Sequence, residues 1–318
     1  MNIFIAGHNG MVGGAIHDQL KRSDQDLNII TVEKSDLNLL DQNDVRNFFK
    51  KNQVDQIYLA AAKVGGIFAN QRYPADFIYE NLMIQSNIMN SANHAEINKI
   101  LFLGSSCIYP KFSKQPIKEE YLMTGSLEET NEAYAIAKIT GLKLCESFNK
   151  QYGRDYRSIM PTNLYGPNDN FHHENSHVIP SLITRFHSAK LANLDEIVIW
   201  GSGKPKREFM HVSDLAKASV HLMNLEKDYF HEKVNGSHVN VGWGKDISIK
   251  ELACLISEVT NFKGDINFDL SKPDGTPRKL LDTTKLKLLG WEPTISLKDG
   301  LCSTYDWFKE NLNSIKKI

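Results

Sequence analysis

Residues 3–13 read IFIAGHNGMVG, a short apolar run followed by glycines at positions 7, 10 and 13. This stretch predicts a strand, a tight turn, and a helix that begins near Met11. Gly7 and Gly10 allow the backbone to approach a pyrophosphate closely, and the positive helix N-terminus attracts that anion. Gly13 allows the helix to pack closely against the strand. The stretch therefore predicts a dinucleotide-binding turn.

Short β-rich runs alternate with helical patterns through the first half of the chain that follows this turn. Strands are expected over residues 29–32, 56–61, 99–104 and 157–162, and helices over 44–51, 76–95 and 134–152. Strands separated by helices form parallel βαβ crossovers. The predicted fold class is therefore α/β, a Rossmann-type doubly wound parallel sheet with a smaller α/β lobe.

The second lobe is expected because the alternation changes after residue 165. A polar loop over 168–177 precedes a helix over 180–189, and a strand over 239–242 rejoins the first sheet. Both domains are then discontinuous in sequence. We expect a Rossmann domain made of residues 1–165 and about 207–243, and a substrate-binding lobe made of about 166–206 and 244–318.

Composition and charge exclude several classes of partner. The 318 residues include 37 basic and 38 acidic side chains, so no overall field attracts nucleic acid or an anionic membrane. No run of about 18 apolar residues and no secretory signal occurs, so we expect a cytoplasmic protein. The four cysteines lie far apart, which indicates no disulfide framework. His172, His173 and His177 share a loop with few carboxylates, so no metal site is expected.

Two residues after the expected second strand indicate different dinucleotides. Glu33 stands where a carboxylate would bind the adenosine ribose hydroxyls of NAD, and Lys34 stands where an amine would meet the 2′-phosphate of NADP. His8 and Asn9 in the glycine turn contact either the ligand or solvent. The residues alone leave NAD and NADP open.

A second group of residues supplies acid–base chemistry. Tyr134 and Lys138 are four positions apart, so they share one face of the expected helix. A nearby ammonium favours the phenolate, and we expect it to lower the pKa of Tyr134. Ser105 follows the strand over 99–104, at the edge where doubly wound sheets bind ligands. Its hydroxyl is placed to polarise a substrate carbonyl beside Tyr134.

Several long motifs add a family resemblance that covers essentially the whole chain. Besides the glycine turn they are residues 59–67 (LAAAKVGGI), 73–78 (YPADFI), 104–110 (GSSCIYP), 134–138 (YAIAK), 160–167 (MPTNLYGP), 175–180 (NSHVIP) and 272–279 (KPDGTPRK). The chain resembles the extended short-chain dehydrogenase/reductases, and among them the epimerase-reductases that act on GDP-4-keto-6-deoxy-D-mannose.

The resemblance implies a two-stage reaction on one sugar nucleotide. Protons are first exchanged at C3 and C5 on either side of a C4 ketone, and NADPH then delivers hydride to C4. Cys107 matches the family's base and His177 its acid, while Ser105 and Tyr134 stabilise the C4 oxygen. Without the resemblance, Cys107 would be interpreted as a buried packing residue.

The resemblance also implies binding residues and a homodimer. The residues that match the family's NADP(H) positions are Gly7, His8, Asn9, Gly10, Met11, Val12, Gly13, Lys34, Asn38, Leu39, Leu103, Gly104, Ser105, Tyr134, Lys138, Pro161, Thr162, Asn163, Leu164 and His177. The residues that match its GDP-sugar contacts are Arg185, Trp200, Arg207, Asp274 and Lys279. Guanidinium groups suit phosphate oxygens. Trp200 is equally explained as a core aromatic, and Asp274 and Lys279 as loop charges.

Departures from the family pattern fall at the cofactor. Some members carry arginine where this chain has Asn9 and Lys34, so we expect NADPH to be preferred with weak discrimination. Other functions stay open on the same fold. A nucleotide-sugar 4,6-dehydratase is expected to have Asp-Glu where this chain has Ser106 and Cys107, a 4-epimerase would consume no cofactor, and a non-catalytic dinucleotide sensor would not need the acid–base residues.

Overall fold

A six-stranded parallel sheet forms the centre of the larger lobe. The computed structural model describes residues 1–23, 26–172, 176–313 and 315. The strand order is β2-β1-β3-β4-β5-β9, and all neighbours are parallel. The strands are β1 (Asn2–Ala6), β2 (Asn28–Ile30), β3 (Gln56–Leu59), β4 (Lys99–Leu103), β5 (Asp155–Pro161) and β9 (Val239–Val241). This topology confirms the predicted Rossmann-type fold.

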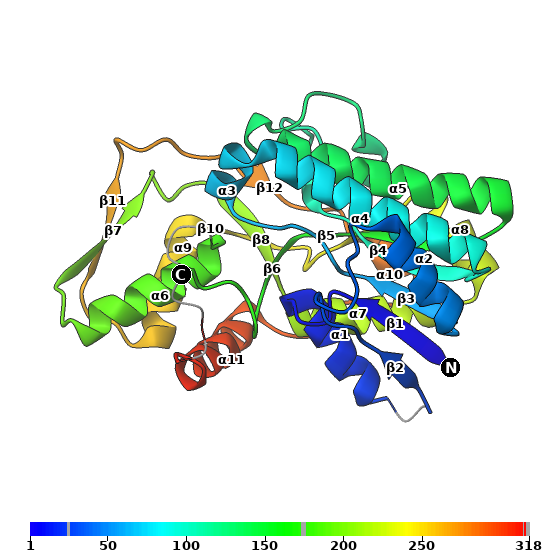
Figure 1. The fold of residues 1–318 in the computed structure, drawn as a ribbon. Coiled ribbons are helices and arrows are strands. Elements are labelled where there is room, and N and C mark those ends of the chain that lie inside the picture. Colours follow the sequence, from blue (N-terminus) through cyan, green and yellow to red (C-terminus); the bar gives the residue numbers. More distant parts are fainter. Residues whose placement is uncertain (24–25, 173–175, 314, 316–318) are drawn as a thin grey trace.

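Helices cover both faces of this sheet. Alternate strand residues point to opposite sides, and the apolar side chains on each side are buried by helices. One face carries α2 (Gln42–Lys51), α4 (Pro74–His94) and α5 (Glu132–Tyr152), and the last two run side by side (Figure 1). The other face carries α1 (Met11–Lys21), α7 (Val212–Asn224), α8 (Lys227–Val234) and α10 (Thr284–Leu288). The expected strands and helices of the first half are present, with ends shifted by at most two residues.

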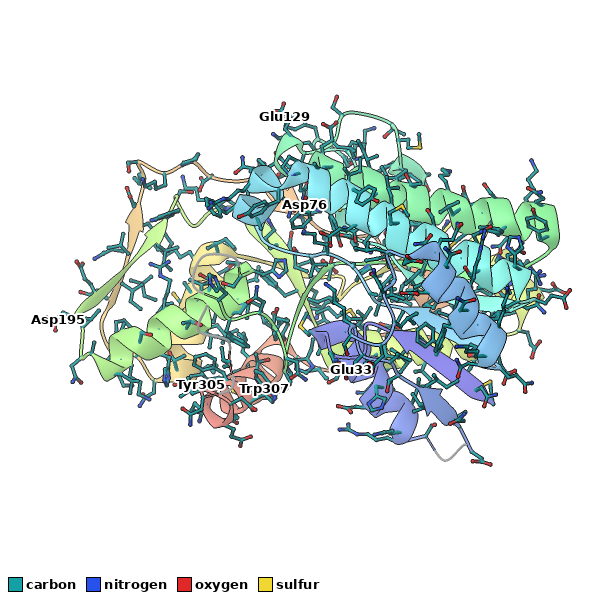
Figure 2. All side chains as sticks on the ribbon, viewed as in Figure 1. Glu33, Asp76, Glu129, Asp195, Tyr305 and Trp307 are labelled. Carbon is teal, nitrogen blue, oxygen red and sulfur yellow. The ribbon has the colours of Figure 1, made fainter. Side chains whose placement is uncertain are left out.

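The smaller lobe has its own apolar core. It contains α6 (Val178–Leu191), α9 (Ile249–Thr260) and α11 (Leu297–Glu310), with the strand pair β7 (Glu196–Trp200) and β11 (Asp265–Asp269). Figure 2 shows Tyr305 and Trp307 of α11 in this lobe. The Trp307 ring stacks on the Phe171 ring, with their centroids 6.0 Å apart. The segment 284–289 does not belong to this core. Its residues Leu286 and Leu289 pack into the core beneath the large sheet.

A four-stranded sheet joins the two lobes. It contains β6 (Asn163–Tyr165), β8 (Lys206–His211), β10 (Asp246–Ser248) and β12 (Arg278–Lys279). The fully buried carboxylate of Glu208 on β8 accepts backbone N–H bonds from Gly244 (2.6 Å) and Leu281 (3.0 Å). A buried carboxylate needs such donors to offset its desolvation. Glu208 thus fixes β8 against the segments that follow β9 and β12.

Short helices occupy the connections on the side of the sheet where the strands end. They are α3 (Ile67–Arg72), η1 (Ser106–Ile108), η2 (Glu119–Tyr121) and η3 (Glu129–Asn131). Their positions were not predicted from the sequence, because each spans less than two turns of periodic pattern. In the parts of the chain that the structure describes, none of the helices has the length and apolar character needed to cross a membrane.

The glycine turn packs without room for side chains. Gly7 has a φ of +91°, and a Cβ on it would lie 2.7 Å from the Ala61 backbone nitrogen. A Cβ on Gly13 would lie 2.1 Å from the Gly7 carbonyl oxygen. Gly10 precedes α1 and places no side-chain acceptor over the helix N-terminus. The turn therefore leaves backbone N–H groups available to an anionic ligand.

We predict that Gly13→Ala destabilises the fold more than Gly153→Ala does. The Cβ at Gly13 meets backbone that cannot move without opening the turn. A Cβ at Gly153 meets no atom within 4 Å, so only its φ of +66° opposes the change, at a cost of about 1–2 kcal/mol. Urea unfolding of both variants measures the difference. Equal losses of unfolding free energy would contradict the close contact at Gly13.

Candidate active site

A large pocket opens at the carboxyl ends of β1, β3, β4 and β5 and extends to β12 in the smaller lobe. This is the edge where doubly wound sheets bind ligands. Its wall contains all of the residues that match cofactor positions and all five that match catalytic positions. These are Gly7, His8, Asn9, Gly10, Met11, Val12, Gly13, Lys34, Asn38, Leu39, Leu103, Gly104, Ser105, Cys107, Tyr134, Lys138, Pro161, Thr162, Asn163, Leu164 and His177.

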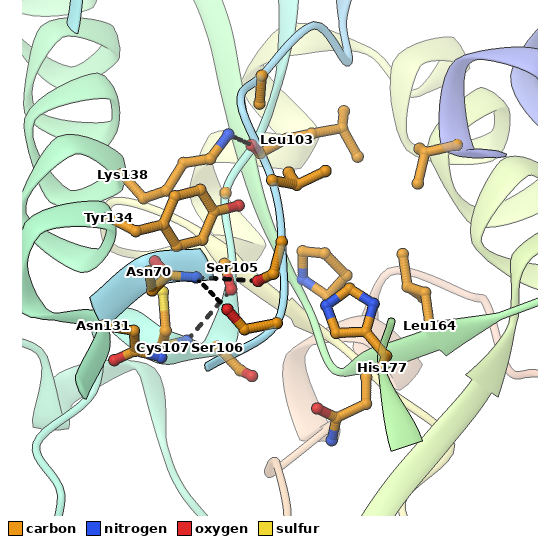
Figure 3. A pocket seen from close by; sticks show the side chains of 18 of the residues that line it. Asn70, Leu103, Ser105, Ser106, Cys107, Asn131, Tyr134, Lys138, Leu164 and His177 are labelled. Atoms are coloured by element: carbon orange, nitrogen blue, oxygen red, sulfur yellow. Dashed lines mark hydrogen bonds between the residues drawn. The ribbon is translucent and has the colours of Figure 1, made fainter. Parts of the chain in front are cut away.

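Lys138 and Tyr134 project from α5 toward the end of β4 (Figure 3). The Lys138 amine donates a hydrogen bond of 2.7 Å to the Leu103 carbonyl oxygen, and it lies 5.7 Å from the centre of the Tyr134 ring. The Tyr134 ring packs edge-on against Phe77, with centroids 6.2 Å apart. The sequence prediction that the two side chains share a helix face agrees with this arrangement.

The prediction that the pKa of Tyr134 is lowered is wrong. Burial raises the pKa of Tyr134, and the nearby Cys107 acts in the same direction. Burial also lowers the pKa of Lys138 to about 8. The physical reason is desolvation, which disfavours both charged forms and outweighs the attraction expected from helix spacing alone. The phenol is therefore protonated at neutral pH.

Cys107 is the central residue of η1, and only 7% of it is exposed. Its backbone N–H donates a bond of 3.3 Å to the Ser105 hydroxyl oxygen. Burial raises the pKa of the thiol, whereas the charge of Lys279, the Ser105 hydroxyl beside the thiol and the charge of Lys138 act to lower it. Desolvation is the largest of these effects, so the thiol is protonated at neutral pH, and Lys279 and Lys138 are the cations placed to stabilise its ionised form.

His177 lies directly before α6 and projects into the pocket from the smaller lobe (Figure 3). The surrounding protein desolvates its ring and lowers its pKa. The sequence predicts no metal site in the loop before His177. His173 and Asn175 lie outside the described residues, and the described residues contain no cluster of three or more His, Cys, Asp or Glu side chains that could hold a metal ion.

The ambiguity at the second strand has a structural answer. The Glu33 carboxylate accepts a bond of 2.8 Å from the Asn9 amide and lies 3.3 Å from the His8 ring nitrogen. Lys34 lines the pocket. Glu33 therefore braces the turn, and Lys34 presents a cation to whatever ligand extends past β2.

The five predicted GDP-sugar contacts divide into two groups. Arg207, Asp274 and Lys279 line the pocket, and the Asp274 carboxylate accepts bonds from the Ser202 hydroxyl (2.6 Å) and backbone N–H (2.8 Å). Arg185 and Trp200 lie outside the pocket wall. Arg185 donates to the Val198 carbonyl oxygen, and Trp200 is 72% exposed, with the Lys272 amine 5.4 Å from its ring.

Two pocket residues were missed by the sequence analysis. Asn70 on α3 and Asn131 in η3 both line the pocket close to Cys107 (Figure 3). A lone asparagine between helical patterns carries no motif, and the only available signal was the position of Asn131 three residues before Tyr134.

The comparisons with known proteins agree with this geometry. The model of the NAD dependent epimerase/dehydratase family matches residues 3–242. These residues include the glycine turn, Ser105, Cys107, Tyr134 and Lys138. The chain therefore belongs to the NAD dependent epimerase/dehydratase family.

Individual relatives give a narrower placement. The chain is 59% identical to the GDP-L-fucose synthase of Escherichia coli K12, over 97% of both chains, and 53% identical to GDP-L-fucose synthase 1 of Arabidopsis thaliana, over 98% and 94%. Among solved structures, a GDP-L-fucose synthetase from Naegleria fowleri bound to NADP matches with a TM-score of 0.88 and 27% identity, over 99% and 96% of the two chains. A GDP-D-glycero-L-gluco-heptose synthase from Campylobacter jejuni, solved with NADPH, matches with a TM-score of 0.90 and 35% identity, over 97% and 98%. The chain falls among the GDP-L-fucose synthases, which confirms the resemblance found in its motifs.

The structure predicts how the four cysteines react with an alkylating reagent. Cys254 and Cys302 are exposed, whereas Cys107 and Cys145 are buried. Because burial raises the pKa of Cys107, we expect it to react slowly at neutral pH and faster as the pH rises and the thiolate forms. Time-resolved peptide mapping by mass spectrometry measures each rate. Modification of Cys107 as fast as Cys254 at pH 7 would contradict the buried, protonated thiol.

Proposed function

We propose that this chain converts GDP-4-keto-6-deoxy-D-mannose to GDP-L-fucose by inverting C3 and C5 and then reducing the C4 ketone with NADPH. One observation carries the proposal: the Cys107 thiol lies in the same pocket as Ser105, Tyr134 and Lys138. A ketone reductase needs only the last three residues. The thiol supplies a separate base, which the proton exchange at C3 and C5 requires.

We assign the epimerisation to Cys107 and His177. Inversion needs one group that removes a proton from one face of the sugar and another that protonates the opposite face. The two side chains come from different lobes, η1 of the Rossmann domain and the residue before α6. Lys279 is the cation that most favours the Cys107 thiolate. The Ser105 hydroxyl stabilises the oxygen of the enolate that forms when either C–H bond breaks.

We assign the proton transfer of the reduction to Tyr134. Burial keeps its phenol protonated until the C4 oxygen becomes basic, and the phenol then gives that oxygen its proton. The Lys138 ammonium, fixed at the Leu103 carbonyl oxygen, stabilises the phenolate that remains. Bound NADPH supplies the hydride. The same oxygen is thus stabilised in both stages by the same side chains.

The residues of the pocket fit NADP(H). The contact between Gly13 and Gly7 leaves a backbone cradle without side chains at the uncapped N-terminus of α1, which suits a pyrophosphate. Lys34 is placed for the 2′-phosphate, since the Glu33 carboxylate is engaged by Asn9 and His8. These contacts favour NADPH over NADH, and the neighbouring carboxylate keeps the discrimination modest.

The nucleotide end of the substrate is assigned to the smaller lobe. Arg207 and Lys279 are neighbours on β8 and β12 and present cations for the diphosphate. Asp274 binds Ser202, two residues after Trp200, so the exposed indole stands near the rim of the pocket. We propose that the guanosine extends over this rim toward Trp200 and Arg185, where an aromatic face suits a planar base.

We also propose a cytoplasmic homodimer that pairs through α4 and α5. The two helices lie side by side on one face of the sheet, and Tyr79 and Ile136 are 60% and 40% exposed on them. Apolar groups at such positions are used for association. All four cysteines are free, which suits a reducing compartment.

The function is tested by incubating the purified protein with GDP-4-keto-6-deoxy-D-mannose and NADPH. We expect GDP-L-fucose to form with loss of one NADPH per sugar, measured by nuclear magnetic resonance and absorbance. Formation of a C4 epimer without loss of NADPH would support a 4-epimerase instead. Binding of NADPH without turnover would support the sensor.

Replacement of Cys107 separates the two stages. We expect Cys107→Ala to slow deuterium exchange at C3 and C5 in deuterated water by about 10²–10⁴-fold, because the base is lost. Cys145→Ala is the matched control, since Cys145 is a buried free cysteine that does not line the pocket. It is expected to exchange like the wild type. Unchanged exchange in Cys107→Ala would refute the role of the thiol.

A further inference from the structure

Unpaired polar atoms collect in the pocket. In the described part of the chain, the buried side-chain oxygens that lack a hydrogen-bond partner and belong to pocket residues are Asn70 Oδ1, Asn131 Oδ1, Asp169 Oδ2 and Ser176 Oγ. A buried acceptor left without a partner destabilises the protein relative to a satisfied one, because its desolvation is not compensated. Such atoms at a site mark places where a ligand supplies the missing donor. Asn70 and Asn131 line the part of this pocket that Figure 3 draws together with Cys107.

The orientation of the Asn70 amide is determined by its surroundings. Its nitrogen donates to the carbonyl oxygens of Gly65 (2.9 Å) and Gly66 (3.0 Å). A flipped amide would direct its own oxygen at these two acceptors, which is unfavourable. The oxygen is therefore the atom left without a partner. Because Asn70 is only 6% exposed, water provides little compensation at this position.

The side chain of Asn131 does not cap the helix that follows it. Asn131 is the N-cap residue of α5, where an asparagine side chain normally accepts a hydrogen bond from the first turn of the helix. Here the side chain makes no capping bond, and its buried oxygen stays unpaired. Tyr134 lies three residues further along the same helix, on the face that meets the pocket. The side-chain oxygen of Asn131 therefore does not cap the helix, and it can accept a hydrogen bond from a ligand at the reaction centre.

The proposed substrate has donors that match these two acceptors. In GDP-4-keto-6-deoxy-D-mannose, C1 carries the diphosphate, C4 the ketone and C6 a methyl group, so the hydroxyl groups of the sugar ring are those at C2 and C3. Ser105 and Tyr134 are directed at the C4 oxygen in the mechanism above. One of the two hydroxyls is bonded to C3, a carbon that Cys107 must reach, and the other is bonded to the adjacent C2.

We propose that Asn70 and Asn131 form an amide pair that accepts hydrogen bonds from the C2 and C3 hydroxyl groups of the hexose, one from each. The assignment rests on the proposed function. The pair orients the sugar so that its C–H bonds face the Cys107 thiol, and it makes the site selective for a sugar that carries both hydroxyls. A site with a buried unpaired acceptor discriminates strongly against an analogue that lacks the donor.

The test combines variants with substrate analogues. Asn70→Ala and Asn131→Ala are compared with the wild type on GDP-4-keto-6-deoxy-D-mannose and on its 2-deoxy and 3-deoxy analogues. Deuterium uptake at C5 is the readout, because C5 carries a hydrogen in all three compounds. On the parent sugar we expect each variant to lower kcat/KM about 10- to 100-fold.

The analogues separate recognition from structural damage. For each variant, one deoxy analogue should bring wild type and variant within about twofold, because neither has that hydrogen bond. Asn47→Ala on the exposed face of α2 is the control, and we expect it to match the wild type on all three sugars. The same loss of kcat/KM on all three sugars would overturn the assignment, since damage to the loop at Gly65 and Gly66 acts regardless of the hydroxyls. Failure of the wild type to turn over the parent sugar would instead overturn the proposed function.

Discussion

The hydrogen bond from the Lys138 amine to the Leu103 carbonyl oxygen determines how the reaction centre is assembled. It joins α5 to the end of β4, and the chain on either side carries the reactive groups. Tyr134 lies one helical turn before the lysine, and Ser105 and Cys107 follow directly after the strand. Lys138 is only 4% exposed, so this carbonyl oxygen provides a hydrogen-bond partner that water cannot supply. Loss of this bond would therefore move the Tyr134 phenol relative to both the Ser105 hydroxyl and the Cys107 thiol.

The smaller lobe completes the site through a second constraint, the buried carboxylate of Glu208. Its bonds to the backbone at Gly244 and Leu281 hold β8 and β12 in position beside the large sheet. Arg207 and Lys279 are thereby placed at the pocket, and Lys279 is close enough to influence the ionisation of Cys107. The base that starts the epimerisation in the proposed mechanism belongs to one lobe, and the cation that stabilises its ionised form belongs to the other.

Much of the fold and part of the site follow from local sequence patterns. The glycine turn, the alternating strands and helices, and the placement of Ser105 at the end of β4 were predicted because each depends on residues close in the chain. The pKa of Tyr134 was predicted in the wrong direction, because burial is a property of the tertiary structure. The engagement of Glu33 by the turn was not visible either, since it needs the distance between separate loops. Asn70 and Asn131 were missed for a related reason: an unpaired amide is recognised only when its surroundings are known.

In the proposed mechanism, one pocket carries out both the epimerisation and the reduction on the same sugar. The most direct measurement is the isotope content of GDP-L-fucose formed in deuterated water from unlabelled GDP-4-keto-6-deoxy-D-mannose and unlabelled NADPH. We expect deuterium at C3 and C5, delivered from solvent, and protium at C4, delivered from NADPH. A product with protium at C3 or C5, or with deuterium at C4, would contradict this mechanism.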